Sequence, residues 1–385
     1  MRIDSKVPPL LGTLLMLALA RRVAAAQVPS PPDSATVDPE RQNSRWSPPR
    51  LEGAGGVIYL PKLYYSTDNS FGAGGQILRP FRLPGCGDRA LDSEISLKAR
   101  VTIDGYLRAE IRTTLYPRGA DWMFRAKISH DNLSRRFWGV GTDTPSEDEE
   151  NFRPQDTLAY VEFFRTLVPR LRIGVRGEYE HFKYDDVEAG GLLETTDYPG
   201  KGVDGISGVG LLAEWDSRDD QHDPHRGLYL QAFSLAFGEK TGSDFSFNNY
   251  NVDLRGYLPI SEGQVLALQY FLYSALGDAP IWRYAELGGR PHSRGYRTGR
   301  YVDRLLMAFQ AEYRRPLSWR LGLSAFAGLA NVTEEYHHFE LEHMRPTIGG
   351  GLLLRTGRQS NVVIRSELAA GENSLRAHLS IGHAF

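Results

Sequence analysis

The chain has 385 residues, of which 24% are charged, and a formal net charge of −2 at pH 7. This near balance gives no electrostatic reason to expect nucleic acid as a partner. Cys86 is the only cysteine, which excludes a small scaffold stapled by internal disulfides. The mean hydropathy of −0.38 fits a soluble protein, but it also fits a membrane-spanning barrel, because barrel strands expose only alternate residues to lipid.

The first residues have the features of an export signal. Two basic residues precede a short apolar run at 10–20, and small residues at 24–26 offer a cleavage site. We therefore predict a cleaved signal peptide over 1–26. Residues 27–54 are rich in Pro, Ser, Asp, Arg and Gln, which predicts a disordered periplasmic leader. No later window has the 18 uncharged apolar residues of a membrane-spanning helix.

From residue 55 to residue 385 the sequence alternates between apolar and polar residues in segments of about ten. In 95–104, for example, every second residue is apolar and its neighbours are mostly charged or polar. About sixteen such segments can be counted. A soluble sandwich or propeller would not need so many charged faces, and the aromatic residues lie near segment ends, as interfacial girdles require. We predict an all-β fold, a transmembrane antiparallel β-barrel of about sixteen strands over 55–385.

Two interruptions of this pattern hold polar residues in unusual density. The first contains Asp216, Arg218 and Asp219 and continues to Gly227; we interpret its charges as lumen-facing partners at a strand end rather than as a catalytic cluster. The second, 277–303, is rich in arginine and glycine and also contains several aromatic residues. A loop of this length is usually functional or disordered, and its aromatic content favours a packed, functional loop.

In the strand that follows, 304–315, the alternation of residues predicts which side chains face the lumen. Leu305, Met307, Phe309, Ala311 and Tyr313 form one face, which we assign to lipid; Gln310, Glu312 and Arg314 then face inward.

The last strand, 378–385, ends on Phe385. Alternation predicts that this aromatic side chain shares the outward face with Leu379 and Ile381. The pattern resembles the terminal assembly signal of outer-membrane barrels, with Ile381, Gly382 and Phe385 as its residues.

Taken together, these motifs resemble the BamA/TamA-like superfamily of bacterial surface antigen barrels. The matching stretches, in chain order, are Asp216-Ser217-Arg218-Asp219 with Pro224 and Gly227, Leu287-Gly288-Gly289 with Arg294-Gly295-Tyr296, Glu312 to Leu317, Gly349 to Leu352, and the Phe385 terminus. Their order and spacing agree over 205–385, and the N-terminal half fits more loosely.

The resemblance implies that Arg294, Gly295 and Tyr296 lie in the sixth extracellular loop and that this loop folds into the lumen. Family members often have an aspartate where Gly328 stands here. We therefore expect Glu312 to be the lumenal partner of Arg294; the alternative is a solvated arginine. Typical members carry periplasmic POTRA domains, and 27–54 is too short for one, so the expectation is a barrel-only member.

Metal binding and catalysis have weaker support in the sequence. Two groups of histidines lie near carboxylates, namely His222 and His225, and His337, His338 and His343, but neither shows a closed four-ligand pattern. We predict no metal site and no cofactor. The sequence has no Gly-x-Ser-x-Gly elbow and no His-Glu-x-x-His pair, so we predict no catalytic residues and no enzyme.

The resemblance implies a role in outer-membrane protein assembly or translocation, through a lumen closed by the loop around Arg294. Expected partners are outer-membrane lipid, the barrel-assembly machinery for the protein's own insertion, and a periplasmic partner or client polypeptide. A passive or plugged solute pore is the alternative, and an outer-membrane hydrolase is less favoured.

Overall fold

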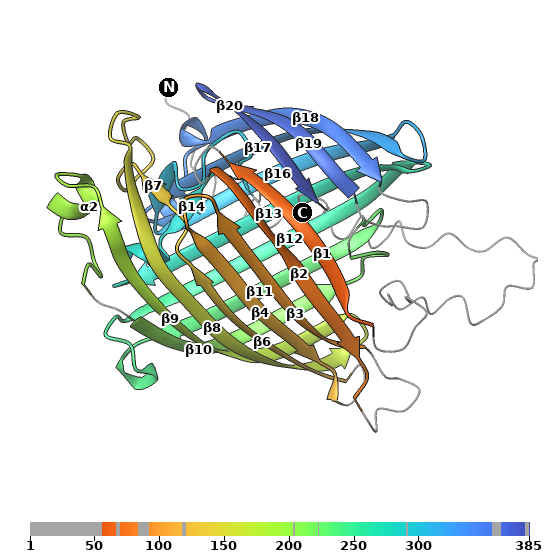
Figure 1. The fold of residues 1–385 in the computed structure, drawn as a ribbon, viewed down its shortest axis with the longest axis horizontal. Coiled ribbons are helices and arrows are strands. Elements are labelled where there is room, and N and C mark those ends of the chain that lie inside the picture. The colour runs from red at the N-terminus through yellow and green to blue at the C-terminus, as the bar shows by residue number, and fades with distance from the viewer. Residues whose placement is uncertain are drawn as a thin grey trace, which may run out of the picture.

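The computed structural model describes residues 56–66, 70–83, 92–117, 121–202, 205–221, 223–289, 292–355, 363–381 and 385. The predicted signal peptide and leader, together with Gly382 of the expected assembly signal, lie outside the described residues. Seventeen of the described strands form one large sheet that curls into a barrel, and two more form a separate two-stranded sheet (Figure 1).

Sixteen strands of 8 to 19 residues make up the barrel wall. The first eight are β1 (Ile58–Ser66), β2 (Ser70–Phe81), β3 (Ser93–Thr102), β4 (Leu107–Leu115), β6 (Trp122–Asp131), β8 (Glu150–Val168), β9 (Leu171–Val187) and β10 (Gly205–Asp216). The second eight are β11 (Gly227–Phe237), β12 (Phe247–Ser261), β13 (Gln264–Gly277), β16 (Leu305–Pro316), β17 (Leu321–Thr333), β18 (Arg345–Arg355), β19 (Val363–Gly371) and β20 (Ser374–Ile381). A short seventeenth strand, β7 (Arg135–Phe137), pairs with the start of β8.

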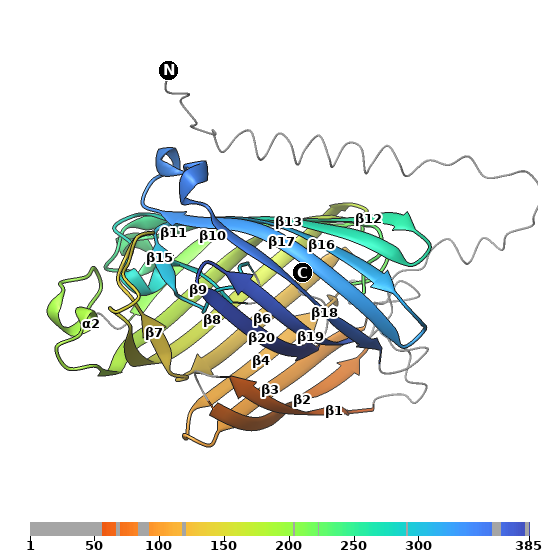
Figure 2. The same cartoon turned by 90° about the horizontal axis from the view of Figure 1, so that it is seen from above.

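Each wall strand pairs antiparallel with the next one in the sequence, from β1 through to β20. The predicted antiparallel barrel of about sixteen strands is therefore confirmed. Within the described ranges no hydrogen-bonded ladder joins β1 to β20. These two strands are the edges of the sheet, and Figure 2 shows both on the side that faces the viewer.

The two ends of the barrel differ in their connections. One end, here called the turn end, has mostly short turns. The other, the loop end, carries the short elements α2 (Leu192–Thr195), η3 (Glu239–Thr241), η4 (Ile281–Arg283), β14 (Ala285–Leu287), β15 (Tyr301–Asp303), η5 (Tyr336–His338) and η6 (Leu341–His343). In the described part of the chain no helix has the length and apolar composition that a membrane crossing requires.

Apolar side chains point outward along the wall, and charged side chains point inward. On β3, Leu97 and Val101 are 40% and 52% exposed, whereas Lys98 pairs with Glu110 of β4 at 3.0 Å. At the loop end of β16, however, Leu305 and Met307 are buried rather than open to lipid, because Phe339 and Tyr336 of the loop after β17 pack in the same cluster. Strand periodicity predicted their direction correctly, but it carries no information about a loop that folds back over the outer wall.

The lumen is filled with apolar side chains at the loop end. Phe182 stacks on Trp282 with ring centroids 5.3 Å apart, and Phe237 stacks on Phe247 at 4.3 Å. These rings belong to a buried cluster shared by the wall and the loops. Apolar packing therefore joins the wall and the loops at this end of the barrel.

Inward-facing glycines permit this packing, and we expect Gly210→Ala to destabilise the barrel. A Cβ at Gly210 would lie 1.9 Å from the Ser234 carbonyl oxygen, whereas one at Gly177 would meet only Val161, at 3.7 Å. Overpacking of this kind typically costs about 1–3 kcal/mol. Chemical unfolding of the refolded barrel should show this loss for Gly210→Ala and little change for Gly177→Ala; equal stability of the two variants would contradict the packing.

Candidate functional site

The loop between β13 and β16 is a hairpin that folds into the lumen. Its two short strands β14 and β15 pair, and Leu287, Tyr296 and Tyr301 pack on inward-facing residues of β16 and β17. Gly288 has φ +117°, and a Cβ there would lie 1.7 Å from the Arg297 carbonyl oxygen, so the tight bend requires glycine. The bend brings Arg294 to the tip of the hairpin.

The Arg294 side chain is completely buried. Its Nη1 donates to Glu312 Oε2 at 2.7 Å and to Glu367 Oε1 at 2.8 Å. Its guanidinium carbon lies 3.5 Å from the ring centroid of Phe326, so one face of the cation stacks on an aromatic ring. The expected contact between Arg294 and Glu312 is thus present, and Glu367 is a second partner.

Glu312 also accepts hydrogen bonds from two other arginines. Arg365 donates to both of its carboxylate oxygens, Nη1 to Oε1 at 2.9 Å and Nη2 to Oε2 at 2.8 Å. Arg314 Nε donates to Oε1 at 2.8 Å. We call these five groups, Arg294, Glu312, Arg314, Arg365 and Glu367, the lumenal charge cluster. None of its members is more than 4% exposed.

The sequence analysis did not identify Arg365 or Glu367. Alternation along 363–371 places both on the inward face, which was an available signal. Their contact with Glu312 depends on barrel curvature, because β16 and β19 are separated by two strands. Glycines provide the room: a Cβ at Gly351 would lie 2.8 Å from Glu367 Cγ, and one at Gly349 would lie 2.4 Å from the Phe326 ring.

Gly295 and Tyr296 attach the hairpin tip to the last three strands. A Cβ at Gly295 would lie 2.6 Å from the backbone of Ala370, so only glycine fits there. Tyr296 Oη donates to the Pro346 carbonyl oxygen at 3.0 Å and accepts from the Glu372 N–H at 3.0 Å. His378 Nε2 lies 2.8 Å from the Arg294 carbonyl oxygen. The hairpin tip thus contacts β18, the β19–β20 turn and β20.

The position of Phe385 corrects one prediction. Leu379 is 79% exposed on the outer wall, but Phe385 is 4% exposed and packs on Tyr257, Val265 and Ala267. Its carbonyl oxygen accepts from Arg314 Nη2 at 3.1 Å. Phe385 lies beyond the described part of β20, Ser374–Ile381, so the alternation along that strand does not decide its direction.

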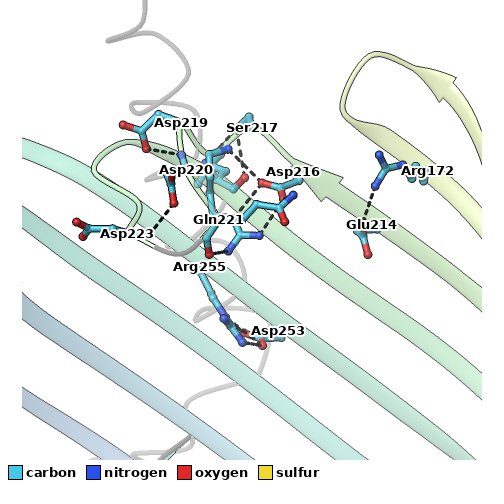
Figure 3. Close-up of polar contacts among 12 residues, drawn as sticks. Arg172, Glu214, Asp216, Ser217, Asp219, Asp220, Gln221, Asp223, Asp253 and Arg255 are labelled. Atoms are coloured by element: carbon cyan, nitrogen blue, oxygen red, sulfur yellow. Dashed lines mark hydrogen bonds and ion pairs between the residues drawn. The ribbon is translucent and has the colours of Figure 1, made fainter. Parts of the chain in front are cut away.

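The second predicted motif lies at the turn end, between β10 and β11. Arg218 donates to both carboxylate oxygens of Asp216, at 3.0 and 2.8 Å. Asp219 Oδ1 accepts from the backbone N–H groups of His225 and Arg226, at 2.9 and 3.1 Å. It also accepts from the backbone N–H of Asp220 at 3.1 Å (Figure 3). Gly227 has φ +109°, and a Cβ there would lie 2.3 Å from the Ser217 carbonyl oxygen. These residues shape a turn and do not join the lumenal charge cluster.

A family model described as the Omp85 superfamily domain matches residues 108–362. The chain belongs to the Omp85 superfamily. The resemblance to BamA/TamA-like barrels is thereby confirmed. No curated protein matches the chain.

Solved structures of Omp85 barrels share the fold at low sequence identity. BamA from Haemophilus ducreyi lacking POTRA domains 1–3 aligns with a TM-score of 0.58 and 12% identity, over 86% of this chain and 69% of that one. CdiB from Acinetobacter baumannii aligns with a TM-score of 0.53 and 10% identity, over 86% and 65%. CdiB from Escherichia coli aligns with a TM-score of 0.55 and 10% identity, over 85% and 61%. The chain thus spans about two thirds of the length of these structures.

Membership of the Omp85 superfamily implies a bacterial outer-membrane setting. Members of the superfamily are generally transporters or assembly factors rather than enzymes. The outward apolar face and inward charged face of this Omp85 barrel suit that setting, because only the outer wall meets lipid.

We expect Glu312→Gln to destabilise the barrel by about 3–5 kcal/mol, because it would leave three buried arginines facing a single carboxylate. The free energy of unfolding, measured with urea on barrels refolded in lipid vesicles, tests this. Glu334→Gln is the matched control, since Glu334 is 62% exposed and lies 3.8 Å from Arg304; its effect should stay within about 0.5 kcal/mol. Equal effects of the two changes would refute a structural role for the cluster.

The hairpin should also be less stable in acid. His292 stacks on Phe271 with ring centroids 3.7 Å apart. Burial lowers the pKa of His292 to about 4; the negative charge of Asp253 opposes this shift, and the positive charge of Arg255 adds to it. The unfolded chain would bind a proton below about pH 6.5, but the docked hairpin would not until about pH 4. The contribution of His292 to the free energy of unfolding should therefore be constant above pH 6.5 and should fall as the pH decreases from 6.5 to 4.

The measurement compares unfolding free energies at pH 7.5 and 5.0 for the wild type and His292→Phe, which keeps an aromatic ring but cannot titrate. Other titrating groups are common to both proteins, so the difference isolates His292. We expect the wild type to lose about 2 kcal/mol more than the variant. Identical pH profiles would show that His292 is not buried in solution.

Proposed function

We propose that this Omp85 barrel acts in the assembly or translocation of polypeptides at the outer membrane, with the Arg294 hairpin as its closing element. The observation that carries the proposal is the burial of Arg294 between Glu312 and Glu367. A buried arginine is costly unless carboxylates meet it with good geometry, so the site favours one docked position of the hairpin.

The contacts of the hairpin support a coupling between the lumen and the sheet edge. Through Tyr296 and the backbone of Arg294, the hairpin is bonded to β18, the β19–β20 turn and β20. Strand β20 is one free edge of the sheet, and an edge strand offers unpaired backbone groups to an incoming strand. Release of the hairpin would therefore open the lumen and loosen this edge together.

We also propose a route by which the protein reaches the outer membrane. Residues 1–26 would direct export and be removed, 27–54 would form a periplasmic leader, and 55–385 would insert with the help of the barrel-assembly machinery. Ile381, Gly382 and Phe385 would form the assembly signal. A client polypeptide, with or without a periplasmic partner, would be the substrate.

Single-channel conductance tests the closing role of the hairpin. We expect the refolded wild type to be mostly closed and Arg294→Ala to open frequently, because alanine removes both ion pairs and the stacking on Phe326. Arg315→Ala is the control, since Arg315 is an exposed arginine on the same strand as Glu312. A wild type as steadily open as Arg294→Ala would instead identify a passive pore.

A further inference from the structure

The loop after β17 has an unusual composition. Residues 334–344 contain four glutamates and three histidines, and no lysine or arginine. The loop also contains η5 and η6, which project outward from the barrel wall as short blue coils in Figure 2. The hydrogen bonds of Arg294 described above go to Glu312, Glu367 and His378, which lie outside this loop.

Apolar and hydroxyl contacts anchor η5 to the outer wall. Tyr336 Oη donates to Ser274 Oγ at 3.0 Å, and Ser274 is completely buried. Phe339 is 3% exposed and packs with Leu305 and Met307. Because the residues on both sides of His337 and His338 are held against the wall, the two imidazoles are presented to solvent from a fixed backbone.

Glu335, His337 and His338 converge at this surface. Their potential ligand atoms all lie within 4.8 Å of one another, and they are the one such group of three found in the described part of the chain. His337 Nε2 lies 3.1 Å from Glu335 Oε2, and the two histidine rings are 4.1 Å apart between centroids. All three side chains are exposed, so an ion could reach them without a change in the barrel.

We infer that Glu335, His337 and His338 bind a divalent transition-metal ion, Zn²⁺ foremost, at the loop end of the barrel. Two imidazoles and one carboxylate are a donor set that suits Zn²⁺, with water at the remaining position. The other three glutamates of the loop raise the local concentration of cations. From the sequence we predicted no metal here, because the histidines and carboxylates show no closed four-ligand pattern.

Titration of the refolded full chain with ZnCl₂, followed by calorimetry, tests the site. We expect one saturable site per barrel. The single changes His337→Ala and His338→Ala should each weaken binding at least about tenfold, and Glu335→Gln should weaken it less. Binding should also weaken at pH 5.5 relative to pH 7.5, because a metal and a proton compete for the imidazole nitrogen. A Co²⁺ absorption spectrum would report directly on imidazole coordination.

His343→Ala is the matched control, since His343 lies in the same loop and pairs with Glu340 at 3.7 Å. The affinity of His343→Ala for Zn²⁺ should stay close to that of the wild type, because His343 is not one of the proposed ligands. Absence of saturable binding would overturn the inference, as would equal binding by the His337→Ala, His338→Ala double variant. A loss in His343→Ala as large as that in His338→Ala would overturn the ligand assignment. The Zn²⁺ titration does not measure conductance, so its outcome is independent of the proposed closing role of Arg294.

Discussion

The carboxylate of Glu312 is the point on which the lumen of this barrel depends. It accepts hydrogen bonds from Arg294 of the hairpin, Arg314 of its own strand and Arg365 of β19. With Glu367, the cluster has three positive and two negative groups away from water. Such a group is stable only when every partner is in place, because a buried ion without a partner costs several kcal/mol. The hairpin and the wall therefore hold each other in one arrangement.

Small residues make that arrangement sterically possible. Gly349 and Gly351 leave room for Phe326 and Glu367, and Gly295 lets the hairpin backbone touch that of Ala370. Two donor atoms of Arg294, Nε and Nη2, have no hydrogen-bond partner among the described residues. The face of the same guanidinium stacks on Phe326. The cluster thus combines ion pairs, an aromatic face and close backbone contact.

Different interactions hold the two ends of the barrel. At the loop end, aromatic side chains pack together, as in the stacking of Phe182 on Trp282. These contacts do not involve charged groups. At the turn end, Arg314 links the cluster to Phe385 and approaches the Pro224 carbonyl oxygen at 3.5 Å. Through Glu312, Arg314 thereby connects the Arg294 hairpin with the Asp216–Gly227 turn.

The sequence alone predicted the barrel, its number of about sixteen strands and the direction of side chains on segments such as 304–315, because alternation in ten-residue segments is a local property. It also indicated Glu312 as a partner for Arg294, since both the inward face of 304–315 and the family motif can be recognised without coordinates. Glu367, the burial of Phe385 and the cover over Leu305 depend on contacts between distant segments. Barrel curvature, the approach of Phe385 to β12 and β13 and the outward fold of the loop after β17 decide those contacts, and no local pattern encodes them.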